Sequence, residues 1–170
     1  MRWDTMHTQK GLTISEDGLT LSWDDNCPGE FQPCWLGAQT TARLERRLFA
    51  WDFVIDCIAD RQIGVGILVA PPDWGFFGYL GAGRNAWAYD AYEGAIVTET
   101  KAIHSGLPTI KARGVVAVRL DLRVPCACSF VVDGRETPLI PLPEGAVVIP
   151  AACLLKRGQR VTLRGFQVQD

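Results

Sequence analysis

Residues 49–57, Phe-Ala-Trp-Asp-Phe-Val-Ile-Asp-Cys, give the clearest indication of the fold. Large apolar side chains take every second position, on one face of the segment: Phe49, Trp51, Phe53, Ile55 and Cys57. Two acidic residues, Asp52 and Asp56, fall on the opposite face. A period of two is the side-chain repeat of a β-strand, and an apolar face opposite a polar one indicates that one side is buried and the other is wet.

Strand signals recur along the rest of the chain, at 12–14, 19–23, 62–70, 115–122, 129–132, 146–154 and 161–168. Gly18 and the pair Asp133-Gly134 predict tight hairpin turns between neighbouring strands. Only 38–47 (AQTTARLERR) has helical character, and it lacks a sustained apolar stripe. Ten to twelve strands with little helix predict an all-β fold, an antiparallel β-sandwich of two sheets.

Length and composition exclude several classes of protein. The chain has 170 residues, of which 48% are hydrophobic, which is enough for one core and predicts a single domain over 1–170. Seventeen basic and nineteen acidic residues give a net charge of −2, without the basic excess expected of a nucleic-acid binder. No apolar run approaches the ~20 residues of a membrane helix. The first residues lack the apolar core of a signal peptide, so we expect a cytoplasmic protein that contacts neither nucleic acid nor membrane.

Six cysteines are present, and we interpret them as structural thiols. Cys57, Cys128 and Cys153 lie within apolar stretches, where a free cysteine behaves as a small buried hydrophobe. The remaining pairs, Cys27/Cys34 and Cys126/Cys128, do not have the close spacing of a zinc site. A metal or redox role for these pairs stays open as an alternative, and the sequence predicts no metal and no cofactor.

Seven fragments, in order, resemble the motifs of the SPRY (B30.2-like) domain family. They are RLFAWDFVI at 47–55, IGVGI at 63–67, NAWAYD at 85–90 with Glu93-Gly94, GVVAVRLDL at 114–122, FVVDG at 130–134, VIPAACL at 148–154 and VTLRGF at 161–166. The resemblance covers 47–168 as a family-like core and leaves 1–46 for N-terminal strands and a loop. It implies a bent, concanavalin-like sandwich whose function is protein–protein interaction, through loops at one end.

The loop that follows Pro71-Pro72 is the first candidate binding site. Asp73, Trp74 and Phe76 lie in it, and aromatic side chains anchor interfaces because they bury a large area at a small entropic cost. Phe77 and Tyr79 are expected to pack in the core instead. Arg84, in a glycine-rich loop, would bind a carboxylate or a peptide carbonyl.

Tyr92, in the sequence DAYEG, is the remaining candidate contact, whereas Trp87 is expected in the core. Glycines 64 and 66 share one strand face, which predicts a bulky neighbour packed against that face. The set of proposed partner-binding residues is therefore Asp73, Trp74, Phe76, Arg84 and Tyr92.

Two other function classes stay open beside a module that binds a peptide or protein. A carbohydrate-binding module would use Trp74, Tyr79 and Tyr92 to stack on sugar rings. A glycoside hydrolase or lyase needs two convergent carboxylates, and Asp52 and Asp56 would lie about 13 Å apart along one strand at roughly 3.3 Å per residue.

A nucleophilic site is not indicated either. His104-Ser105 are neighbours in an expected loop over 102–108, and adjacency in the sequence does not align a base with a nucleophile. We therefore expect no catalytic residues. A symmetric homodimer stays open, because a free-standing sandwich has edge strands and a net charge of −2 offers little repulsion.

Overall fold

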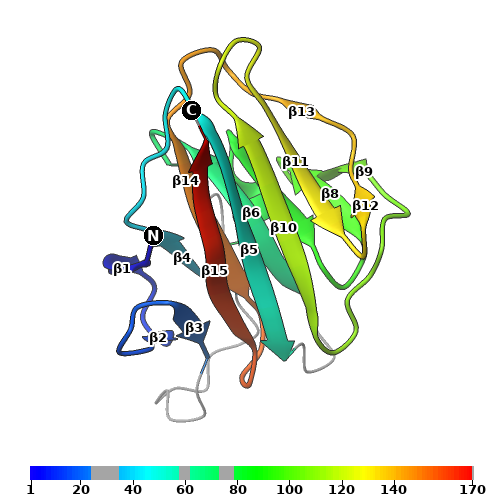
Figure 1. Cartoon of the computed structure of the whole chain (residues 1–170). Coiled ribbons are helices and arrows are strands. Elements are labelled where there is room, and N and C mark those ends of the chain that lie inside the picture. The colour runs from blue at the N-terminus through cyan, green and yellow to red at the C-terminus, as the bar shows by residue number, and fades with distance from the viewer. Residues whose placement is uncertain (24–34, 58–61, 73–78, 170) are drawn as a thin grey trace.

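The computed structural model describes residues 1–23, 35–57, 62–72 and 79–169, and these form two antiparallel sheets packed face to face (Figure 1). The architecture confirms the predicted all-β sandwich. Its one described helical segment is the short 3₁₀ helix η2 (Leu80–Ala82).

The seven-stranded sheet runs in the order β1 (Trp3–Thr8), β4 (Leu36–Thr40), β14 (Val148–Leu154), β6 (Ile63–Val69), β7 (Ala86–Asp90), β8 (Ala95–Thr98) and β9 (Lys101–His104). The eight-stranded sheet runs in the order β12 (Arg135–Glu136), β11 (Ala127–Val132), β10 (Gly114–Asp121), β5 (Leu48–Cys57), β15 (Arg160–Gln169), β3 (Thr20–Ser22) and β2 (Thr13–Ile14), with β13 (Ile140–Pro141) also paired to β11. Strands distant in the sequence are neighbours in both sheets, so the contacts that hold the fold are mostly long-range.

Strand β5 lies at the centre of the eight-stranded sheet, between β10 and β15. Its alternation is confirmed: Trp51, Phe53 and Ile55 are buried between the sheets. Asp52 and Asp56 face outward, where Asp52 accepts a hydrogen bond from Arg164 at 3.4 Å and Asp56 accepts one from the Thr162 hydroxyl at 3.2 Å. The polar face of β5 is thus exposed to solvent, and its two aspartates are hydrogen-bonded to side chains of the neighbouring strand β15.

The predicted hairpin turns are also present. Gly18 has φ +74° and connects β2 to β3, whose residues pair in register. Asp133 and Gly134 both have positive φ, +50° and +73°, and join β11 to β12. Two consecutive left-handed residues are the geometry of a tight two-residue hairpin, which an Asx-Gly pair adopts readily.

The helical character assigned to 38–47 is wrong. Residues 36–40 form β4, which lies between β1 and β14, and Ala38, Gln39 and Thr40 are almost completely buried. Leu44 then bridges to Val148. Pairing on both sides of β4 decides its conformation, since tertiary contacts override the weak helix preference of a ten-residue segment. The strands also number fifteen among the described residues, more than predicted, because three have only two residues each.

A second, smaller core covers the outer face of the seven-stranded sheet. It consists of Leu68, Leu80, Ala86, Ala88, Ile149, Ala151 and Cys153, with Trp35, Ala70 and Tyr79 packed against it. Tyr79 and η2, which come just before β7, therefore lie over this face of the sheet.

Gly64 and Gly66 allow this close packing. A Cβ on Gly64 would lie 2.7 Å from the Cys153 sulfur and 3.7 Å from the Tyr79 ring, and Tyr79 is thus the bulky neighbour. A Cβ on Gly66 would lie 1.9 Å from the backbone oxygen of Trp87, so there the neighbouring strand itself makes the close approach.

Cys126, Cys128 and Cys153 are free and buried. Burial raises the pKa of the Cys128 thiol and raises that of Cys153 to about 12, so both thiols stay protonated. Cys27 and Cys34 lie outside the described residues. Within the part of the chain that the structure describes, no three metal-ligating side chains gather at one place. Nor does any helix there have the length and hydrophobicity of a membrane span.

Candidate recognition surface

Three of the predicted contact residues, Asp73, Trp74 and Phe76, lie outside the described residues, as does Phe77. The structure describes where their loop leaves and rejoins the fold. Ala70 donates its amide hydrogen to the Val147 carbonyl at 2.9 Å, and Pro71 and Pro72 that follow are exposed. The loop therefore starts from a strand end that is anchored to β14 and its preceding turn.

The return of this loop is anchored over the second core. The Tyr79 ring packs against Trp35 with centroids 4.5 Å apart, and burial raises the pKa of its phenol. Leu80 donates its amide hydrogen to the Cys153 sulfur at 3.4 Å. Tyr79 is half-buried, so it packs against the sheet as the sequence predicted but keeps part of its surface in solvent.

Arg84 is exposed in the turn between η2 and β7. Two backbone bonds hold this turn: Thr100 donates to the Gly81 carbonyl at 2.8 Å, and Val69 donates to the Asn85 carbonyl at 2.8 Å. Asn85 is left-handed, with φ +55°. The Arg84 side chain makes no hydrogen bond or ion pair with any residue that the structure describes, so its guanidinium is presented to solvent from a fixed backbone.

Tyr92 lies beyond the opposite end of β7. The Asp90 carboxylate shapes the turn there by accepting the amide hydrogens of Tyr92 at 3.1 Å and Glu93 at 3.0 Å. Burial raises the pKa of Asp90 despite these bonds. The Lys111 ammonium sits 4.1 Å from the centre of the half-buried Tyr92 ring and donates to the Tyr92 carbonyl at 3.0 Å.

The structure thus does not bring Arg84 and Tyr92 together, because the five residues of β7 separate them. Trp87, within β7, is half-buried and packs against the main core rather than lying fully inside it. His104 is also not in a loop as predicted: it is the last residue of β9, paired with Ile96.

Sequence reasoning missed a groove of about 760 Å³ on the outer face of the eight-stranded sheet. Its lining comes from β5, β10, β11, β15 and the segments beside them: Leu48, Phe49, Ala50, Arg119, Leu120, Asp121, Pro125, Ala127, Ser129, Glu136, Leu139, Gln167 and Gln169. A signal was present in the small residues at outward positions, Ala50 and Ala127, which leave space above the sheet.

The charges in this groove are paired. Arg119 binds Glu136 at 2.9 Å, and the Ser129 hydroxyl donates to the other Glu136 oxygen at 2.6 Å. Arg123 donates two hydrogen bonds to Asp121, and this contact holds the pKa of Asp121 below its ordinary value. The groove therefore offers a neutral surface of small apolar and amide groups rather than an acidic or basic site.

Comparison with known proteins gives the fold a name. No protein-family model and no curated protein matches the sequence. Among solved structures, the chain is similar to the SPRY domain of human HERC1, with 16% identity and a TM-score of 0.71 over 98% of this chain and 99% of that one. It is also similar to the TRIM65 PSpry domain, with 15% identity and a TM-score of 0.70 over 96% of this chain and 88% of that one. Stonustoxin matches 96% of this chain with 26% of its own, at 16% identity and a TM-score of 0.67. The chain has the SPRY fold that its sequence motifs predicted.

Proposed function

We propose that this SPRY-fold domain is a non-catalytic recognition module that binds a peptide or a protein surface. The contact would be made by the loop over 71–78, with Asp73, Trp74 and Phe76, and by Arg84 on the turn that follows. The single observation that supports this most is the exposed Arg84 on an anchored turn. The backbone of this turn is already held, so binding costs little backbone entropy there, and the fork of donors on the exposed guanidinium matches a carboxylate or peptide carbonyls.

Tyr92 is a less favourable contact than Arg84. Its ring already carries the Lys111 ammonium, and it lies beyond the far end of β7. A partner that reaches both residues would have to extend along the length of that strand. We therefore assign Tyr92 to the periphery of the proposed surface.

The state of the carboxylates in the groove and on β5 supports a non-catalytic function. A glycoside hydrolase needs one carboxylic acid that is protonated near neutral pH beside one carboxylate. In the groove, Asp121 has a lowered pKa and Glu136 is bound to Arg119 and Ser129. On β5, Asp52 and Asp56 are each bonded to a β15 side chain.

The carbohydrate alternative receives less support from the aromatic residues. Stacking on a sugar needs an open ring face. Tyr79 already has Trp35 against its ring, and Tyr92 has Lys111 over its ring. Trp74 alone of that predicted set is left as a candidate.

The described thiols agree with an intracellular site of action. Cys126, Cys128 and Cys153 are free, and unpaired cysteines are typical of a reducing compartment such as the cytoplasm.

Affinity capture from lysate of the source cells tests the proposal. The wild-type chain is compared with R84A, with W74A/F76A, and with R135A, which removes an exposed arginine of β12 as a matched control. We expect one protein to be retained by the wild type and R135A and lost by the other two, with melting temperatures unchanged for R84A. Equal retention by all four would contradict the site. A glycan-array hit abolished by W74A, without a protein partner, would favour the carbohydrate alternative.

A further inference from the structure

The C-terminal half of β15 is a free strand edge. Residues 160–162 pair with β3 on one side, whereas 164–169 pair only with β5. Figure 1 shows no strand of this sheet on the other side of that half. Every residue from Arg164 to Gln169 is exposed, and Met1 and Leu19 line a small hollow beside the start of this part of the strand.

The free edge carries two exposed apolar side chains. Phe166 is 37% exposed and Val168 is 45% exposed, and they share one face because they are two positions apart. Phe166 stacks on Phe49 with ring centroids 6.1 Å apart, which fixes its position on the sheet. An unpaired row of backbone amide and carbonyl groups beside apolar side chains is a template for another strand.

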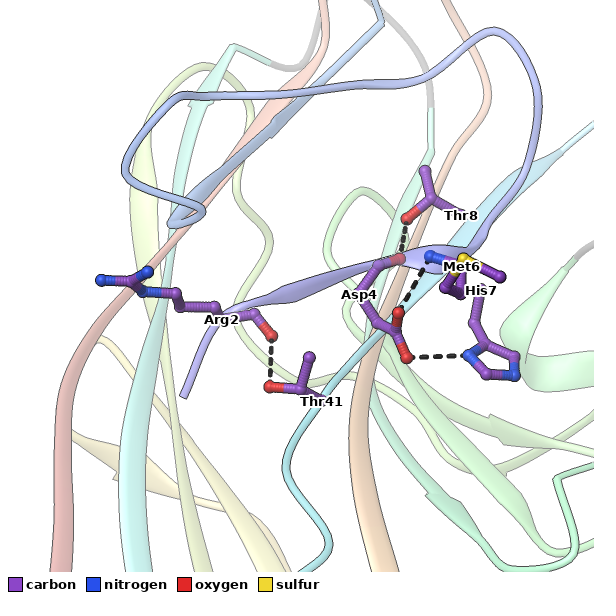
Figure 2. A network of polar contacts seen from close by, with 6 residues as sticks. All are labelled: Arg2, Asp4, Met6, His7, Thr8 and Thr41. Carbon is purple, nitrogen blue, oxygen red and sulfur yellow. Dashed lines mark hydrogen bonds and ion pairs between the residues drawn. The ribbon is translucent and has the colours of Figure 1, made fainter.

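Three other edge strands of the sandwich, β1, β9 and β12, carry charges of the kind that prevent such pairing. On β1, the Asp4 carboxylate binds the His7 ring at 2.7 Å and the Met6 amide at 2.9 Å (Figure 2). That strand also pairs irregularly with β4. Lys101 lies on the edge strand β9, and β12 consists of Arg135 and Glu136.

Residues 165–169 of β15 contain no charged side chain. Arg164, just before them, is bonded to Asp52. The one protective feature is a bulge between Arg164 and Gln167, which contains Gly165, with φ +65°, and Phe166. From Gln167 to Gln169 the strand pairs regularly with β5 and carries no charge, so this part of the edge is open to pairing.

We propose that the occupant of this edge is a second copy of the chain, paired antiparallel to the first about a two-fold axis at Gln167. In that register Phe166 of each copy lies opposite Val168 of the other, and the two Gln167 side chains meet at the axis. Directly opposite apolar side chains stabilise a strand pair. The same sequence therefore complements itself, as a two-fold interface requires.

Charge also permits a second copy. The net charge of the chain is −2, and among the described residues of this half of β15 the one formal charge, Arg164, is already paired with Asp52. Because only a few residues of each copy take part, the interface buries a surface area at or below the lower limit for specific complexes, and we expect a weak dimer. The inference does not depend on the peptide-binding function proposed above.

The whole chain is tested by sedimentation velocity and light scattering over a concentration series from about 5 to 500 μM, a range suited to weak complexes. The expected result is a reversible rise in mass from 18.7 kDa toward twice that value. A chain that stays monomeric throughout overturns the proposal and leaves the edge to a strand of some other protein.

A pair of double variants tests the register. F166K/V168K places like charges opposite each other at two symmetric positions and should weaken the dimer by about tenfold or more, since opposed like charges destabilise a strand pair. F166K/V168E changes the same positions but places opposite charges in register, and should retain the dimer. M6K adds a charge to the exposed Met6 of β1 and is the control for an unrelated edge.

Folding is monitored separately, because Phe166 contacts Phe49. V168K alone leaves that contact in place and should also weaken the dimer, with a melting temperature close to that of the wild type. A dimer that V168K and F166K/V168K leave intact overturns the proposal. So does loss of the dimer in F166K/V168E when that variant is folded, because the two-fold register predicts its rescue.

Discussion

Replacing Gly66 by alanine should be one of the most damaging single-methyl changes in this protein. The added Cβ would lie 1.9 Å from the Trp87 backbone oxygen and 3.1 Å from the Ala88 Cα. A backbone atom cannot rotate away, so β7 would have to move from β6. Inserting a methyl into a packed core costs about 1–3 kcal/mol, and occasionally more. Weakening two or three ladder hydrogen bonds would add about 1 kcal/mol each. We therefore expect the free energy of unfolding to fall by about 3–6 kcal/mol, out of a total of about 5–15 kcal/mol for a typical domain.

Urea unfolding followed by tryptophan fluorescence measures this loss, and two glycine variants calibrate it. Gly64→Ala meets the Cys153 sulfur at 2.7 Å, a side-chain atom that can shift, so about 1–3 kcal/mol is expected. Gly106→Ala has no heavy atom within 4 Å but has φ +73°, so backbone strain alone should cost about 1–2 kcal/mol. The reasoning is refuted if Gly66→Ala is no more destabilising than Gly106→Ala. That result would mean that a methyl group fits between β6 and β7 without moving either strand.

Three further predictions concern buried polar groups. Asp90→Asn should raise the free energy of unfolding at neutral pH, since burial raises the pKa of Asp90 and the amide oxygen can still accept the Tyr92 and Glu93 amides. The raised pKa means that the folded protein binds the proton more tightly than the unfolded chain does. The stability advantage of the variant should therefore disappear as the pH falls through the folded pKa toward the ordinary value of 3.8. A stability advantage that is independent of pH would contradict this. Tyr89→Phe removes the 2.5 Å hydrogen bond from the tyrosine hydroxyl to the Pro108 carbonyl, and the free energy of unfolding should fall by about 1–2 kcal/mol in thermal or urea unfolding. Amide exchange at 107–110 should also become faster. Unchanged exchange there would show that the bond does not hold that loop. Alkylation followed by peptide mapping should leave Cys128 and Cys153 unmodified in the native protein and label them in urea, because burial keeps both thiols protonated; native labelling at either would be inconsistent with the packing.

The architecture could be predicted because its signals are local. The alternation over 49–57 defines a strand with one buried face, and four residues of that face lie in the core: Phe49, Trp51, Phe53 and Ile55. Asp133-Gly134 defines a two-residue turn through the backbone preferences of the two residues themselves. Neither inference needs knowledge of the neighbouring strand. The family-like motifs could also be recognised one by one, and their order along the chain predicted the SPRY fold.

The geometry of the candidate site was harder to predict from the sequence. The segment 38–47 shows why. Its weak helix preference is overridden because β4, which begins this segment, pairs with β1 on one side and β14 on the other, and both strands are distant in the sequence. Arg84 could be predicted as an exposed loop residue, but not that an entire strand separates it from Tyr92. Distance along the chain is not distance in space until strand lengths and register are known.

The period of the strands, the turns between them and the class of fold could be read from local patterns of residues, because each depends on residues within a few positions of one another. The groove over β5, β10, β11 and β15 could not, because it forms where residues from four strands come into register. The same is true of the end of β15, which has β5 on one side and no strand partner on the other among the described residues. Which strand lies beside which depends on contacts across the whole chain, and no local pattern of residues encodes them.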